Sequence, residues 1–265
     1  MCSVPIGHED DITIRVKHAL QHAPVIFCED TRVTHQLLVQ QGIFLKQHLI
    51  RMDQIQESQA LAQFDRWIQT GDVAYVSDAG TPTISDPGAQ LVAHARLTGI
   101  EVQILGGISA VSAFLAGAGK LFQGYFFGGF MPRKEGDKKR AIDTLIQSKQ
   151  LGVWFESPRR IVATLDCIQR NYPPIDVVVA KELTKPYEQF FVGSATDVYH
   201  QLNRSDQRGE WIFLIDARQY QAPQTDYAKM AKQLKQMGIN AAQLKPLSQL
   251  FDLNKNQLYD QFQQL

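Results

Sequence analysis

The sequence predicts an α/β protein with two α/β domains and a small helical tail. Up to about residue 120, short apolar runs alternate with helical patterns, which is typical of a parallel sheet. Beyond that point strand patterns follow one another with fewer helices between them, which indicates a mixed sheet. The length of 265 residues agrees with two domains, because one compact core rarely needs so many residues.

The N-terminal domain is predicted over residues 1–120. Its buried strands are short, continuous apolar runs at Val25–Cys28, Val73–Val76 and Ile100–Leu105. A helix is expected between the first two, where apolar residues recur at helical spacing: Leu61, Phe64, Trp67 and Ile68. Residues 88–97 and 109–118 also predict helices, opened by Asp86-Pro87-Gly88 and by Ser109.

The C-terminal domain is predicted over residues 121–218, with the boundary at 119–124. Its expected strands are Tyr125–Phe130, Leu151–Phe155, Val177–Ala180, Gln189–Val192 and Trp211–Ile215. Helical patterns stand only around 138–148 and 159–170, so some strands follow each other directly.

The helical tail is predicted over residues 226–265, after a linker at 221–225. Leu244, Leu247 and Leu250 fit one short helix, and Leu258 with Phe262 fits another, with a turn at 253–256. This order resembles a helix–turn–helix. A helical hairpin packed on the body is the favoured alternative, because the tail carries only a few basic residues.

Composition narrows the function classes. Lys and Arg together number 27, as do Asp and Glu, so the formal net charge is zero and does not indicate a nucleic-acid-binding protein. The three cysteines form no CxxC pair and the histidines show no ligand spacing, so we expect neither a disulfide framework nor a metal site. No signal peptide and no long apolar run is recognised, which predicts a soluble, cytoplasmic protein without a membrane span.

The most informative stretch is residues 76–88, Val-Ser-Asp-Ala-Gly-Thr-Pro-Thr-Ile-Ser-Asp-Pro-Gly. It follows a predicted parallel strand, and open α/β sheets bind ligands at that end of their strands. Gly80 has no side chain to keep a ligand away, and Pro82 stiffens the loop. The alternative is an ordinary tight turn between a strand and a helix.

Further loops are expected at the same edge of the first sheet. They are Val4-Pro5-Ile6-Gly7-His8, Glu29-Asp30-Thr31-Arg32 and Leu105-Gly106-Gly107-Ile108-Ser109. Residues 156–160 and 181–185 follow strands of the second domain and would close a cleft from the other side. Glu29 and Asp30 are candidates for acid, base or ribose-binding roles, or else for the capping of a helix N-terminus.

Basic residues gather at residues 133–140, after an aromatic strand. Arg133, Lys134, Lys138, Lys139 and Arg140 would attract phosphates, and Arg159 with Arg160 would extend the patch. The alternative is a solvated loop and helix start.

In combination, these motifs resemble those of a known family. The strings are Pro5-Ile6-Gly7, Glu29-Asp30-Thr31-Arg32, Val76–Pro82 with Asp86-Pro87-Gly88, Gly128-Gly129-Phe130-Met131-Pro132, Phe155–Arg160 and Lys181–Lys185. In this order they resemble the small-subunit (16S) rRNA cytidine-2′-O-methyltransferase family, a branch of the tetrapyrrole methylase superfamily. The resemblance extends over the whole chain, tail included.

The resemblance implies a methyltransferase that binds S-adenosylmethionine between two α/β domains of the tetrapyrrole methylase type. It also implies a homodimer, with 16S rRNA or the small ribosomal subunit as partner. The implied donor-binding residues are Pro5, Gly7, Asp78, Ala79, Gly80, Thr81, Pro82, Gly107, Ser109, Ala110, Phe155, Ala180 and Gly209. The implied RNA-facing residues are Glu29, Asp30, Arg32, Arg133, Lys134 and Arg159.

Transfer of a methyl group to a ribose hydroxyl needs alignment of donor and acceptor, and help with the proton of the hydroxyl. The candidates for proton handling are Glu29, Asp30 and Glu182, with Arg32 as an electrostatic aid. We carry two alternatives: a methyltransferase acting on a tetrapyrrole or other small molecule, and a catalytically weakened RNA-binding homologue.

The last alternative follows from departures from the family pattern. Gly106-Gly107-Ile108-Ser109-Ala110 stands where the family has two prolines, so a more flexible loop is expected. Only Met1 to Val4 precede Pro5, so we also expect an incomplete first strand, and His8 replaces an expected Asn.

Overall fold

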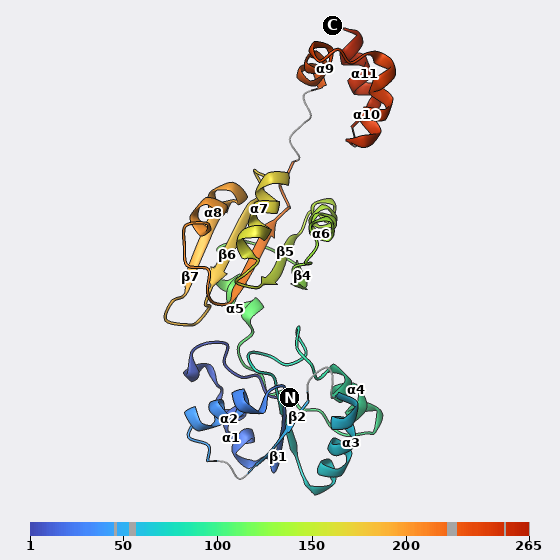
Figure 1. Ribbon diagram of the computed structural model, residues 1–265. Coiled ribbons are helices and arrows are strands. Elements are labelled where there is room, and N and C mark those ends of the chain that lie inside the picture. Colours follow the sequence, from blue (N-terminus) through green and yellow to red (C-terminus); the bar gives the residue numbers. More distant parts are fainter. Residues whose placement is uncertain (45–46, 53–56, 222–226, 252, 265) are drawn as a thin grey trace. The chain divides into compact units, whose positions relative to one another are not determined.

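The computed structural model describes residues 1–44, 47–52, 57–221, 227–251 and 253–264. These residues form two compact units, Met1–Tyr220 and Gln221–Leu265 (Figure 1). The first unit contains two sheets, each with its own helices, which we call the first and second lobes. No helix among the described residues is long and apolar enough to span a membrane.

The first lobe is built on a parallel sheet of three strands in the order β2-β1-β3. The strands are β1 (Val25–Cys28), β2 (His48–Arg51) and β3 (Val73–Val76). The helices are α1 (Ile14–His22), α2 (Thr31–Gln40), α3 (Glu57–Trp67) and α4 (Ala89–Leu97), with 3₁₀ turns at Glu9–Asp11 and Ile68–Thr70. Figure 1 shows α1 and α2 on one side of the strands and α3 and α4 on the other.

Alternation along β1 explains the two layers of helices. Ile26 and Cys28 pack with Val16, Leu20 and Leu38 of α1 and α2. Val25 and Phe27 point to the opposite face and pack with residues of α3 and α4. Because every β1 side chain is fully buried, the strand reads as a continuous apolar run in the sequence.

The sequence predicted β1 and β3 correctly and missed β2. The predicted strand at residues 100–105 is wrong, because only Leu105 makes an isolated bridge, to Cys2. Backbone hydrogen bonds join Leu105 to Met1 and Ser3, while the Ile104 side chain is exposed. An apolar run becomes a strand only where a neighbouring backbone pairs along its length, and here that pairing is local.

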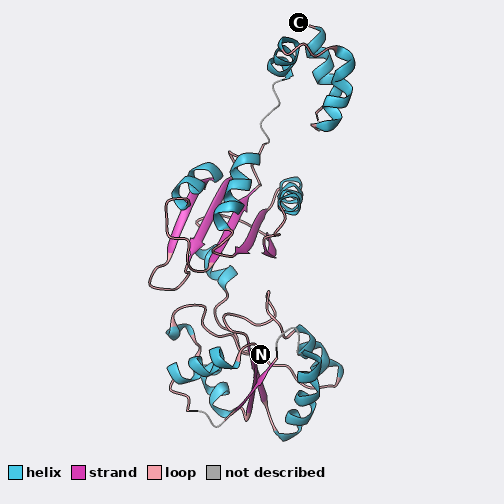
Figure 2. Ribbon diagram, in the orientation of Figure 1, coloured by secondary structure: helices cyan, strands magenta, loops and turns pink. Residues whose placement is uncertain are grey.

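The second lobe is built on a mixed sheet in the order β4-β5-β8-β6-β7, with β4 parallel to β5 and the other pairs antiparallel. The strands are β4 (Tyr125–Phe130), β5 (Leu151–Glu156), β6 (Asp176–Lys181), β7 (Gln189–Ser194) and β8 (Trp211–Asp216). The helices are α5 (Ala110–Gly117), α6 (Glu135–Ser148), α7 (Ile161–Asn171) and α8 (Ala195–Leu202). Figure 2 shows helices on both faces of this sheet.

Helices α6, α7 and α8 cover one face of the second sheet, on Trp154, Val179 and Phe213. Helix α5 covers the other face, where Phe114 packs with Val153 and Leu214. All five strands predicted for this lobe are present, whereas α8 was not predicted. The domain boundary at 119–124 stays a prediction, and α5, which precedes it, packs on the second sheet.

The tail forms a separate cluster of helices. They are α9 (Tyr227–Gln236), α10 (Leu244–Leu250) and α11 (Lys255–Gln263), with a 3₁₀ turn at Ala241–Gln243. Ala231, Leu244, Leu258 and Phe262 form its buried centre. Asn254 caps α11 by accepting hydrogen bonds from the amides of Asn256 and Gln257. The two predicted helices are present, α9 was missed, and residues 222–225 of the predicted linker lie outside the described residues.

Candidate active site

The loops predicted to share one edge of the first sheet do meet there. The amide of Val4 donates to the carbonyl of Gly80 at 2.9 Å, and the amide of Gly80 returns a hydrogen bond at 3.1 Å. The Thr81 hydroxyl donates to the Ile108 carbonyl at 3.2 Å, and the Asp30 amide donates to Asp78 Oδ1 at 3.0 Å. Each of the other three loops is therefore joined to the loop that contains Gly80.

The loop that contains Gly80 is held in an unusual backbone conformation. Gly80 has a φ of +72°, and a β-carbon there would lie 3.1 Å from Ile6 Cγ2. Thr83 and Ser85 also have positive φ, at 74° and 73°. Side-chain-bearing residues adopt this region at a cost of about 1–3 kcal/mol each, and such residues concentrate at functional sites.

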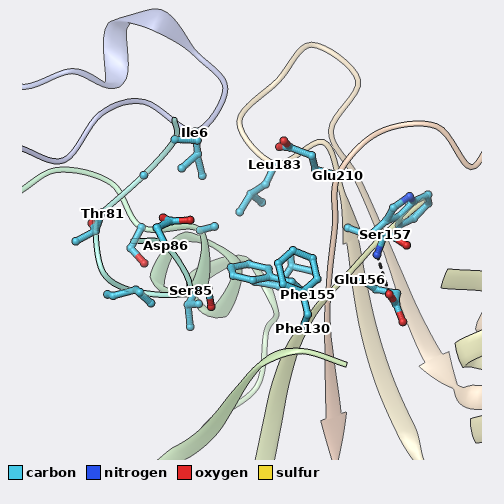
Figure 3. Close-up of a pocket in the computed structure, with 18 of the residues that line it drawn as sticks. Ile6, Thr81, Ser85, Asp86, Phe130, Phe155, Glu156, Ser157, Leu183 and Glu210 are labelled. Carbon is cyan, nitrogen blue, oxygen red and sulfur yellow. Dashed lines mark hydrogen bonds between the residues drawn. The ribbon is translucent and has the colours of Figure 1, made fainter. Parts of the chain in front are cut away.

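A cleft of about 350 Å³ opens between this loop and the second lobe (Figure 3). That volume lies within the range of small-molecule sites, about 300–1,000 Å³. The first lobe and the start of α5 supply one wall, made of Ile6, Ala79, Gly80, Thr81, Ile84, Ser85, Asp86, Ser109, Ala110 and Val111. The second lobe supplies the other, made of Phe130, Phe155, Glu156, Ser157, Pro158, Leu183, Gly209, Glu210, Trp211 and Ile212.

Seven of the residues predicted to bind the donor line this cleft: Ala79, Gly80, Thr81, Ser109, Ala110, Phe155 and Gly209. Six others do not line it: Pro5, Gly7, Asp78, Pro82, Gly107 and Ala180. Ala180 packs in the core against α5, and a β-carbon on Gly107 would lie 2.9 Å from the Ser3 side chain.

Gly7 lies where the two lobes touch. A β-carbon on Gly7 would stand 2.6 Å from both the Thr184 hydroxyl and Lys185 Cγ, and 2.9 Å from the Leu183 carbonyl. The neighbouring His8 amide donates to Thr184 Oγ1 at 3.3 Å. Glycine at this position therefore allows the first lobe to close against the loop after β6.

Asp30 begins a helix rather than facing the cleft. Its carboxylate accepts hydrogen bonds from the Arg32 amide at 2.8 Å and from the Arg32 guanidinium at 2.5 and 3.0 Å. These bonds hold the pKa of Asp30 well below its usual range. Glu29, Asp30 and Arg32 are absent from the cleft wall, so the capping interpretation describes Asp30 in this structure.

Asp86 is a carboxylate that the sequence reading used only as a helix start. It lines the cleft, close enough to Glu29 and Asp78 for their charges to act on it. Burial, and then repulsion from those two carboxylates, raises the pKa of Asp86 to about 6. A carboxyl group with this pKa is ionised at neutral pH and more basic than an ordinary aspartate.

Glu182 fastens one wall of the cleft. Its Oε1 accepts hydrogen bonds from the Glu210 amide at 2.8 Å and from Lys185 Nζ at 3.1 Å, and Lys185 also binds Glu210 Oε2 at 2.9 Å. Burial tends to raise the pKa of Glu182, but these hydrogen bonds lower it overall. A β-carbon on Gly209 would lie 2.7 Å from Glu182 Oε1, so the two residues are closely packed.

The predicted basic patch is only partly at the surface. Arg133, Lys134, Lys139, Arg140 and Arg159 are exposed. Lys138 is buried, and its ammonium donates to Thr164 Oγ1 at 2.9 Å, so its prediction as an RNA-binding residue is wrong. Arg160 is half-buried, pairs with buried Glu156 and donates to the Met131 carbonyl at 3.0 Å. Amphipathic spacing along α6 turns Lys138 inward with Ile142 and Leu145.

Comparison with known proteins decides the family. The family described as tetrapyrrole (corrin/porphyrin) methylases matches residues 2–199. The chain is 37% identical to the ribosomal RNA small subunit methyltransferase I of Neisseria meningitidis serogroup B, over 80% of this chain and 74% of that protein. It is 33% identical to the protein of the same name from Thermotoga maritima, over 81% and 96%.

The chain belongs to the tetrapyrrole methylase family. It is therefore a methyltransferase, and its methyl donor is S-adenosylmethionine. Solved structures agree on the fold: a cobalt precorrin-4 methyltransferase of cobalamin biosynthesis superposes with a TM-score of 0.58 at 20% identity, covering 82% of this chain and 94% of that one. Diphthine synthase gives 0.65 at 12% identity, covering 83% and 90%.

The residues of the cleft fit this donor. Val111, Phe155 and Ile212 offer apolar surface for a purine, which accords with a ligand site that is mostly apolar. Helix α5 begins at the wall, and Ser109, its N-cap, makes no side-chain hydrogen bond to the first turn. The first amides of that helix therefore lack a side-chain cap and suit a negatively charged group.

Most lining residues that the sequence reading missed are neighbours of predicted ones. Ile6, Ile84, Ser85, Asp86, Phe130 and Leu183 all stand inside stretches named in the sequence analysis, where they were given no role in binding. Among the residues that the structure describes, no three His, Cys, Asp or Glu side chains gather as metal ligands would.

Proposed function

We propose that this methyltransferase acts on small-subunit ribosomal RNA, at the ribose 2′-hydroxyl of a cytidine. The observation that carries the proposal is that exposed cations follow lining residues along the chain. Phe130 ends β4 and Ser157-Pro158 follow β5; exposed Arg133 and Lys134 stand three and four residues after Phe130, and exposed Arg159 directly follows Pro158. Cations in this position suit the phosphates that flank an acceptor nucleotide. The relatives named above carry ribosomal RNA in their names, which supports the same substrate.

The chemistry requires one proton acceptor. When bound, S-adenosylmethionine supplies an electrophilic methyl group that needs no further activation by the protein. We assign Asp86 as the base: its carboxylate would take the proton that the 2′-hydroxyl loses as the oxygen–methyl bond forms and the methyl–sulfur bond of the donor breaks, with S-adenosylhomocysteine as the leaving group. Asp30 and Glu182 are weaker choices, because hydrogen bonds from Arg32 and Lys185 stabilise their charged forms.

The walls of the cleft have the complementary task. Ile6 and Leu183 lie at the edge where the lobes meet, and Trp211 and Ile212 close the base of the second wall. Apolar walls exclude water and hold donor and acceptor in line, which is the larger part of catalysis for such a transfer.

We further propose that the protein works in the cytoplasm, where ribosomal subunits are made, and as a homodimer. The dimer has support from β4, an edge strand whose Tyr125 and Phe126 are exposed.

The test is methyl transfer in vitro. Donor labelled on its methyl group is incubated with the protein and with either free 16S rRNA or small subunits from a strain that lacks the modification. The proposal expects incorporation into one cytidine, in a dinucleotide that resists alkali, because a methylated 2′-oxygen cannot attack its phosphate. Label in a base, or in an added tetrapyrrole only, would contradict it.

Calorimetry with the donor alone separates the remaining alternative. A weakened RNA-binding homologue would bind RNA without measurable heat from S-adenosylmethionine. An active enzyme binds both ligands.

A further inference from the structure

Strand β4 changes its register just before it reaches the cleft. Tyr125, Phe126 and Phe127 pair in sequence with β5, and the pairing then shifts so that Phe130 stands opposite Phe155. Gly129 accommodates the shift with a φ of +63°. Bulges of this kind redirect a side chain and are over-represented next to active sites. Here the redirected side chain is Phe130, which lines the cleft.

The backbone around Phe130 is fixed on its far side. Met131 is buried, its amide donates to the Phe155 carbonyl at 3.0 Å, and its own carbonyl accepts a hydrogen bond from Arg160 at 3.0 Å. Arg160 is in turn paired with buried Glu156. The backbone that carries Phe130 is therefore held in place by hydrogen bonds on both sides of Met131.

The Phe130 ring has support on one side and solvent on the other. Its centroid lies 5.6 Å from that of Phe155 (Figure 3). The Phe155 ring in turn meets the Phe127 ring edge-on, with centroids 5.3 Å apart. Yet Phe130 remains 59% exposed. A large aromatic ring that is rigidly held at the mouth of a cleft and left half in water is arranged to receive a flat partner.

We propose that Phe130 is the platform on which the base of the acceptor nucleotide stacks. This inference rests on the proposed function, because it assumes an RNA acceptor. Exposed Arg133 and Lys134 follow Phe130 by three and four residues along the chain, and cations suit the phosphates on either side of a splayed base. The donor has its own apolar surface deeper in the cleft, at Val111 and Ile212, which are both 4% exposed.

The experiment compares Phe130→Ala with Phe130→Tyr and with Phe44→Ala. Phe44 is the control: it is a phenylalanine of the first lobe that is 90% exposed and does not line the cleft. Loss of one base–aromatic stack is worth about 1–3 kcal/mol, which is roughly 5- to 150-fold in affinity. We expect Phe130→Ala to raise the KM for RNA within that range and to leave the Kd for S-adenosylmethionine within about twofold. Phe130→Tyr should retain RNA binding, and Phe44→Ala should change neither constant.

The outcomes are distinguishable. If Phe130→Ala weakens donor binding as much as RNA binding, the ring belongs to the donor site and the inference is overturned while the proposed function stands. An unchanged KM for RNA overturns it as well. If the wild-type protein methylates no RNA, the proposed function fails and the inference falls with it. Thermal unfolding of each variant identifies losses that come from misfolding.

Discussion

Gly7 of the first lobe and Thr184 of the second lobe lie so close together that a β-carbon on Gly7 would not fit between them. The clearance at Gly7 is only 2.6 Å to the Thr184 hydroxyl and 2.9 Å to the Leu183 carbonyl, which is backbone and cannot rotate away. Ile6 and Leu183, the immediate neighbours of this contact, both line the cleft. The contact thus couples closure of the lobes to the shape of the donor site.

Gly7→Ala should therefore weaken donor binding. Overpacking at this contact costs about 1–3 kcal/mol. Part of that cost would appear as a roughly tenfold loss of affinity for the donor, because the added methyl group would push the two lobes apart. Calorimetry with S-adenosylmethionine measures it. Gly124→Ala is the control, because nothing lies within 4 Å of its β-carbon position. Equal affinities for both variants would show that the contact does not shape the site.

The proton-acceptor role of Asp86 predicts a pH profile. The base must be ionised, so kcat should rise with pH through about 6 and then level off. Asp86→Asn should remove this step and lower kcat by about 100-fold or more, with donor affinity retained. Glu101→Gln, an exposed carboxylate elsewhere, serves as the control. A profile that keeps its step in the Asn variant would assign the titration to another group.

The same carboxyl group makes a prediction about stability. Its folded-state pKa of about 6 exceeds its ordinary value of 3.8, so the native state binds more protons between these pH values. Stability from this group is present below about pH 4 and is lost as pH rises through 6. Relative to wild type, Asp86→Asn should raise Tm at pH 7.5 and leave it unchanged near pH 4, as measured by scanning calorimetry. An equal shift at both pH values would contradict the raised pKa.

Glu182 should act by position. In Glu182→Gln, the side-chain amide oxygen can still accept the hydrogen bond from the Glu210 amide. In Glu182→Ala this hydrogen bond is lost, which frees the loop of Gly209 and Glu210, two residues that line the cleft. We expect the Ala variant to weaken donor binding about tenfold and the Gln variant to stay close to wild type. Single-turnover kinetics complete the test. If Gln binds the donor normally yet abolishes transfer, Glu182 handles a proton after all.

The buried chain of polar groups behind the cleft should be sensitive to one deletion. Thr164 Oγ1 donates to Glu156 Oε2 at 2.6 Å and accepts from Lys138 Nζ. Thr164→Val leaves the Lys138 ammonium buried without that acceptor, at a cost of about 1–3 kcal/mol or more. Urea denaturation measures the free energy of unfolding. The control is Thr144→Val on the exposed face of α6, where the hydroxyl binds only the Arg140 carbonyl.

Much of the fold was readable because its strands are buried on both faces. Val25–Cys28, Val73–Val76 and Trp211–Ile215 stand out as continuous apolar runs for this reason. β2 escaped notice because its side chains are only partly buried or exposed. Residues 100–105 look like a strand by composition, but pairing partners decide whether a strand forms, and those come from elsewhere in the chain.

The amino-acid sequence alone determined the two α/β lobes, the edge where the loops gather, and the family, because local patterns and ordered motifs carry that information. Only the tertiary structure decided what individual side chains do at that edge. In the structure, Lys138 is buried, Asp30 caps the N-terminus of α2, and Glu182 binds the loop that contains Glu210. Asp86 and Phe130, in contrast, line the cleft. The physical reason is that burial, charge neighbours and ring contacts arise between residues far apart in the chain, where no local pattern records them.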